Sequence, residues 1–278
     1  MQTVALTWQQ AGELAAGLGC AGVGLRLTGK PRLRRIAPFA TEAFVLAGLY
    51  SLWQLAGKLS LTGASGGFHR AEWIARVEHD WHLPSEASMQ RLVLGHPLIV
   101  QAANLYYATM HFPMLFVFLG WLFVRHRDQY RSVRTTLALT TLVCLVIQLV
   151  PVAPPRLLPG YIDTANQYGQ SVYGLGFVAD QLSAMPSVHV AWAVLIGWYV
   201  VRISPSRWRW IAVAHAAMTV LVVVCTANHW WLDGIVAVAV LVACAWLHRG
   251  LAATWHAVRG RSGAPEPLSG RAPAVIVQ

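Results

Sequence analysis

Six long apolar runs restrict what this chain can fold into. They are residues 39–57, 98–124, 136–152, 187–201, 210–226 and 230–247. Each approaches the roughly 20 apolar residues that cross a bilayer as a helix. Only 12% of the 278 residues are charged, about half the share that is usual in soluble domains. The sequence therefore predicts an all-α integral membrane protein built on a six-transmembrane-helix bundle.

The segments outside these runs differ in composition. Residues 1–35 contain an apolar stretch that polar side chains interrupt, and we interpret them as a cytoplasmic, interfacial segment, with a seventh span as the alternative. Residues 64–97 mix tryptophan, histidine and charge, which predicts an amphipathic interfacial segment between the first two spans. The membrane domain would occupy residues 36–249. Residues 250–278 are rich in glycine, proline and arginine, so we expect a disordered cytoplasmic tail.

Basic residues are distributed unevenly between the segments that join the spans. If six spans alternate, 16 of the 21 lysines and arginines fall on one side. Because basic residues are retained on the cytoplasmic side, both termini are predicted to be cytoplasmic. The loops that carry Arg156, His189 and His229 are then outside. Basic span flanks explain the net charge of +10 more simply than a nucleic-acid partner does.

Three polar pieces that are distant in sequence meet at this predicted outer face. Arg156 follows the third span, "PSVH" opens the fourth, and "NHWWLD" opens the sixth. Helix N-termini attract anions because their first N–H groups lack partners, and the arginine fork fits phosphate oxygens. These pieces predict a phosphate site at the membrane–water boundary, with Arg156, Ser187 and Asn228 as its ligands. Ser187 is equally suited to be only a helix cap.

The two histidines have different neighbours, which predicts different roles. Asp233 lies four residues after His229 and shares its face if both are helical. A carboxylate bonded to one ring nitrogen leaves the other nitrogen free as a nucleophile. His189 can then act as the general acid toward the leaving oxygen. The alternative for His229 and Asp233 is a structural clasp between helices.

Further polar residues have two interpretations each. Asn104, Tyr107 and His111 recur on one face of the second span, where they either line a substrate pocket or bond to a neighbouring helix. Asp163 is either a solvated loop acid or a contact to an acceptor or a histidine. The cysteines show no metal-ligand spacing, so we expect no metal, and no cofactor is expected either.

These motifs resemble signatures of the type 2 phosphatidic acid phosphatase superfamily. "APPR", "PSVHVAW" and "TANHWWLD", with "NLYYATMHFP" upstream, are most similar to the branch that contains fungal inositol phosphorylceramide synthases and their bacterial relatives. The resemblance covers roughly residues 98–247. It implies a six-helix membrane core and metal-independent chemistry through a phosphohistidine, with His229 as the nucleophile and His189 as the acid.

Three positions depart from the pattern of that family. Leu149 stands where the family has a lysine, Val223 where it has an arginine, and Val188 where it has a glycine. The loss of two cations favours the transferase-like branch over an ordinary phosphatase.

The resemblance thus implies a lipid phosphatase or an inositolphosphate-type headgroup transferase of the bacterial plasma membrane. Its donor would be a lipid phosphate, and its acceptor would be water or a polyol such as inositol. The oligomeric state is not indicated. Two alternatives stay open, namely a membrane scaffold without turnover and a transporter or flippase that uses histidine and aspartate as a proton relay.

Overall fold

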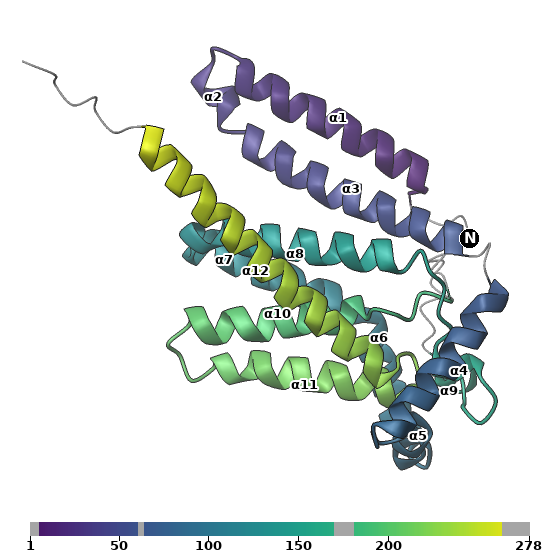
Figure 1. Ribbon diagram of the computed structural model, residues 1–278. Coiled ribbons are helices and arrows are strands. Elements are labelled where there is room, and N and C mark those ends of the chain that lie inside the picture. Colours follow the sequence, from purple (N-terminus) through teal and green to yellow (C-terminus); the bar gives the residue numbers. More distant parts are fainter. Residues whose placement is uncertain (1–5, 61–63, 170–180, 263–278) are drawn as a thin grey trace, which may run out of the picture.

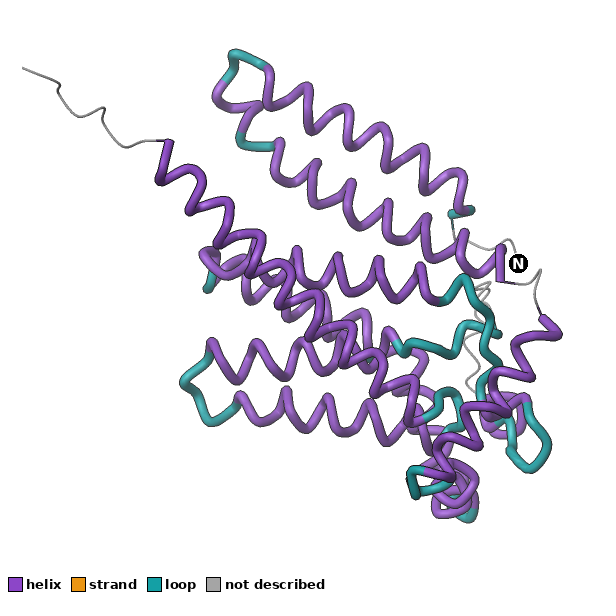
Figure 2. Tube along the Cα trace, in the orientation of Figure 1, coloured by secondary structure: helices purple, strands orange, loops and turns teal. Residues whose placement is uncertain are grey.

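The computed structural model describes residues 6–60, 64–169 and 181–262 of the chain. Throughout these residues the secondary structure is helical, apart from an isolated bridge between Val152 and Ser183. The longer helices lie side by side, and the helices of residues 64–80, 86–94 and 164–168 gather at one end of them (Figures 1 and 2). The predicted all-α class is confirmed.

The N-terminal part of the chain is a helical hairpin. α1 (Trp8–Leu27) and α3 (Ala37–Ser60) lie antiparallel and are joined by the short α2 (Pro31–Arg34) (Figure 1). Their contact is close because glycines face it: a Cβ on Gly22 would lie 3.4 Å from Oγ1 of Thr41. The interfacial position of this segment stays a prediction, and the hairpin geometry equally suits the alternative of a further span.

Three described helices have the length and hydropathy of a membrane span. They are residues Pro31–Leu55 in α2 and α3, Arg127–Ile147, which forms α8, and Trp231–Trp255 in α12 (Trp231–Ser262). A fourth span is available if α6 (Pro97–Thr109) and α7 (His111–Arg125) count as one. α10 (Val188–Ile203) and α11 (Arg209–Cys225) are apolar but have 16 and 17 residues, which at 1.5 Å per residue is about 25 Å. The structure thus supports a membrane protein with three or four long apolar helices, and six spans stay a prediction.

The second predicted span is broken rather than straight. α6 and α7 meet at Met110 with a bend of 49°. Pro113 explains the break, because it has no N–H with which to bond the carbonyl of Thr109. The bend places Tyr107 before it and His111 after it, and both rings contact His189 of α10.

The predicted amphipathic segment forms two helices that cover one end of the bundle. α4 (Ala64–Asp80) and α5 (Glu86–Leu94) lie there together with the short α9 (Thr164–Tyr168) (Figure 1). Ala71 and Ile74 of α4 are buried in a cluster with Trp230. One face of α4 therefore packs on the protein itself.

The basic connections lie at the opposite end of the bundle. The α7–α8 junction, the α10–α11 loop and the α1–α3 connection all lie away from α4 and α5 (Figure 1). The basic loops thus lie at one end of the bundle and the loops that carry Arg156, His189 and His229 at the other, as the charge pattern predicts. Which end faces the cytoplasm stays a prediction. At the C-terminus, α12 continues to Ser262, past the start of the predicted tail, and residues 263–278 lie outside the described residues.

Candidate active site

His229 lies in the turn between α11 and α12, and it is buried. Its Nδ1 is 2.8 Å from the carbonyl oxygen of Ala184 and 3.2 Å from Oδ2 of Asp233. Because a carbonyl oxygen can only accept, Nδ1 must carry the hydrogen. In the neutral ring Nε2 then has the lone pair, and it is buried without a hydrogen-bond partner. A nitrogen in this state is suited to nucleophilic attack.

The turn before His229 is held by the end of α11. The carbonyl oxygen of Val223 accepts hydrogen bonds from the amides of Asn228 and His229, at 3.0 and 3.1 Å. Ala227 has a φ of 54°, a left-handed conformation that usually costs a non-glycine residue energy. Val223 itself stands where the resembling family has an arginine, and here its side chain is buried against Val190.

His189, in the first turn of α10, lies next to His229. The ring centroids of the two histidines are 5.8 Å apart. Tyr107 stacks on His189 at 4.6 Å, and His111 packs edge-on against it at 4.4 Å. The structure therefore brings together both predicted catalytic histidines and two of the three residues of the polar stripe.

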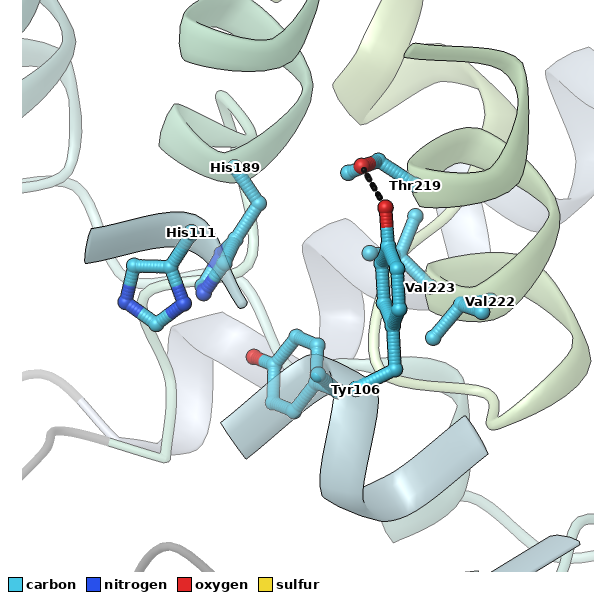
Figure 3. Close-up of a pocket in the computed structure, with 7 residues that line it drawn as sticks. Tyr106, His111, His189, Thr219, Val222 and Val223 are labelled. Carbon is cyan, nitrogen blue, oxygen red and sulfur yellow. Dashed lines mark hydrogen bonds between the residues drawn. The ribbon is translucent and has the colours of Figure 1, made fainter. Parts of the chain in front are cut away.

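A small pocket adjoins His189 between α6, α10 and α11, and Figure 3 shows the residues around it. Tyr106 lies across it from His189, with its hydroxyl 2.6 Å from Nδ1 of His215 and 3.1 Å from Oγ1 of Thr219. Neither Tyr106 nor His215 was expected at the site from the sequence. The sequence did contain one signal, because His215 is an ionisable residue inside the apolar run 210–226. Ionisable groups at membrane depth usually have a polar partner, which here is Tyr106.

Arg156 is buried and reaches the turn that carries His229. Its backbone N–H donates to Ala227, its Nε donates to Oδ1 of Asn228 at 3.0 Å, and its Nη1 forms an ion pair with Asp163 at 3.0 Å. The side chain of Asn228 therefore orients Arg156, and its Nδ2 donates to Thr226. Asp163 thus forms an ion pair with Arg156, which the sequence did not indicate.

The other predicted residues take supporting positions. Ser187 caps α10, with Oγ accepting from the amide of Val190 at 3.4 Å, and its own amide donates to the carbonyl of Asp233. Asn104 bonds through its amide and carbonyl to Thr164 and links α6 to α9. Leu149, at the position of the family's lysine, is 43% exposed.

Two buried carboxylates at the site end of the bundle were not predicted from the sequence. Oε1 of Glu78 accepts from the amide of Leu232 at 2.6 Å, and Oε1 of Glu86 accepts from the amide of Trp231 at 3.2 Å. Both lie in the segment interpreted as a membrane-surface segment. Its charged composition gave no sign that these two side chains point into the protein.

One of three comparisons with known proteins found a match. A family model described as the PAP2 superfamily matches residues 72–247, from α4 to α12. The matched range includes every residue of the site described above and leaves out the α1–α3 hairpin. No curated protein and no solved structure matches the chain.

Proposed function

The chain belongs to the PAP2 superfamily, and from this we propose that it is a membrane phosphatase or phosphotransferase that acts on a lipid phosphate ester. Enzymes of this superfamily are typically metal-independent phosphatases. The observation that carries the proposal is the state of His229, whose Nδ1 is held by Ala184 and Asp233 while its buried Nε2 has no partner.

The proposed reaction has two steps. Nε2 of His229 attacks phosphorus as the bond from phosphorus to the lipid oxygen breaks, and His189 gives that oxygen a proton. Asp233 stabilises the positive charge that develops on the attacking ring. In the second step water or an alcohol attacks the phosphohistidine, His189 takes its proton, and His229 is released.

The charge of the site favours a phosphodiester over a phosphomonoester as the donor. Arg156 contacts the His229 turn, and its charge is already balanced by Asp163. Val223 and Leu149 supply no charge where the family pattern has cations. A phosphodiester carries one negative charge and a monoester nearly two at neutral pH, so a weakly positive site suits the diester better. This supports transfer of a phospho-headgroup.

A direct test compares matched donors with the purified protein. Phosphatidic acid and phosphatidylinositol represent the monoester and the diester, and the specificity constant of each is measured with and without free inositol. We expect the diester to be preferred and a protein-bound phosphohistidine to form. Preference for phosphatidic acid would make the protein a phosphatase. The comparisons do not single out the inositol phosphorylceramide branch, and the inositol arm tests only whether a polyol can replace water as the acceptor.

If the protein were a non-catalytic scaffold, the same test would give the opposite result. A scaffold would form no phosphohistidine with either donor, and His229→Ala would leave its cellular effect unchanged. A proton-relay transporter would move lipid across a bilayer without cleaving it. Both alternatives are therefore excluded if labelled phosphate is trapped on wild-type protein and not on His229→Ala.

A further inference from the structure

The start of α12 is held by carboxylates from three different helices. Asp233 of α12 accepts from the amide of Trp230 at 2.9 Å. Glu86 of α5 accepts from Trp231, and Glu78 of α4 accepts from Leu232. The first N–H groups of a helix have no partners within the helix. Three successive amides are thus bound by side-chain oxygens directly beside the nucleophile.

The two glutamates interact with each other as well as with α12. Glu78 and Glu86 are only 4% and 3% exposed. Burial and the adjacent Glu86 raise the pKa of Glu78 to about 9. Oε2 of Glu78 is buried, and as a carboxylate oxygen it has no hydrogen-bond partner. A proton on this oxygen would allow it to donate to Glu86, which removes both the like-charge repulsion and the unsatisfied atom.

We propose that Glu78 and Glu86 share one proton and act as positioning residues, which fix the start of α12 and thereby hold Asp233 and His229 in register. The effect on catalysis rests on the function proposed above. The shared proton itself does not depend on the proposed function. Neither glutamate contacts the reacting atoms.

The proposal predicts a specific dependence on pH. The groups that face Glu78 are Glu86 of α5, Asp233 of α12 and, more weakly, Tyr161, whose pKa is itself raised to about 12. The folded protein keeps a proton on Glu78 that the unfolded chain releases above its ordinary pKa of 4.5. Stability from this pair therefore falls as pH rises between 4.5 and about 9, because the folded state binds more protons in that window.

Glu78→Gln is the discriminating variant. Its amide oxygen still accepts from Leu232, and its NH₂ group donates to Glu86 without any proton to lose. We expect this variant to keep at least about half of the wild-type kcat at neutral pH. Its stability should not show the fall with rising pH that the Glu78–Glu86 pair causes in wild type. Glu78→Ala leaves the amide of Leu232 unpaired, so kcat should fall by about tenfold or more with little change in KM. Glu72→Gln, at an exposed glutamate of the same helix, is the matched control and should behave like wild type.

Two measurements are made on the full-length protein in detergent between pH 5 and 10. One is kcat and KM on the donor that the wild type prefers, and the other is the thermal unfolding midpoint. We expect the difference in midpoint between Glu78→Gln and wild type to increase steadily with pH. Parallel curves for the two proteins would overturn the shared proton, and an unchanged kcat in a folded Glu78→Ala would overturn the positioning role. If wild type cleaved no phosphate ester, the proposed function would fail, whereas the unfolding curves would still decide whether the proton is shared.

Discussion

Asp233→Asn should slow phosphorylation of His229 without abolishing it. The usual expectation for an aspartate beside a catalytic histidine is that it sets the tautomer of the ring. Here the carbonyl oxygen of Ala184, at 2.8 Å, lies closer to Nδ1 than Oδ2 of Asp233 does, at 3.2 Å. The asparagine variant should therefore keep the hydrogen on Nδ1 and the lone pair on Nε2. What it loses is the negative charge that stabilises the ring during attack.

The magnitude follows from the kinds of hydrogen bond involved. Hydrogen bonds to a charged group contribute about 1.5–3 kcal/mol and neutral ones about 0.5–1.5 kcal/mol, so the change costs about 1–2 kcal/mol, or roughly 5- to 30-fold in rate. Asp233→Ala should do more damage. It also leaves the buried amide of Trp230 unpaired, which adds about 1–3 kcal/mol of destabilisation.

The assay is single-turnover formation of phosphohistidine, measured by rapid quench with a labelled donor, with thermal unfolding of each variant as the folding control. A loss of about 10⁴-fold in a folded Asp233→Asn, the size seen when a tautomer is reversed, would refute the role given to Ala184. A rate equal to that of wild type would refute the electrostatic role of Asp233.

Three further predictions concern the rest of the site and its position. Arg156→Ala should lower kcat/KM by about 10-fold or more through loss of charge-assisted bonds, and Arg156→Lys should recover only part, since a full recovery would show that the fork is not used. His229→Ala should form no phosphohistidine, whereas His189→Ala should lose proportionally less on an activated aryl ester than on a lipid; reversed trapping would exchange the two roles. The third concerns orientation, tested in a background without the native cysteines. Gln167→Cys beside the site should react with an impermeant maleimide in intact cells, and Ser206→Cys at the opposite end should not. The reverse pattern would invert the predicted orientation.

The proximity of His229 and Asp233 was predictable because it depends on residues close together in the sequence. His229 lies only four residues before Asp233, so the two side chains stay within reach of each other although His229 is in the turn before α12 and not in the helix. "PSVH" likewise stands directly before an apolar run, which indicates a helix start. Apolar length likewise predicted the helical class. The proximity of His189 to His229 required only that both helices start at the same end of the bundle.

The features that the sequence did not reveal depend on contacts between distant segments. Glu78 is one charged residue among several in α4, and only packing against α12 separates it from its exposed neighbour Glu72. The ion pair of Arg156 with Asp163 depends on the path of the loop between them. The break at Met110 had a local cause in Pro113, but a proline near a membrane-helix turn is common enough that one long run was read as one span.

The starts of α10 and α12 both lie at the site, but their first amides differ in whether they already have hydrogen-bond partners. The sequence suggested that both could bind an anion, but the amides of Trp230, Trp231 and Leu232 at the start of α12 are occupied by carboxylates. In the described part of the chain, the amides of Val188 and His189 at the start of α10 have no such partner. We therefore expect the phosphate to bind at α10.

Val188→Pro removes one of these amides with little harm to the helix. Proline is favoured at the first helical position, and it requires an extended residue before it, which Ser187 already is, with φ −73° and ψ 102°. Loss of one hydrogen bond to an anion should lower kcat/KM by about 10- to 150-fold, from about 1.5–3 kcal/mol. Val188→Ala shortens the same side chain but keeps the amide, so it should stay close to wild type. Equal kinetics for a folded Val188→Pro and Val188→Ala would show that the phosphate does not bind the start of α10.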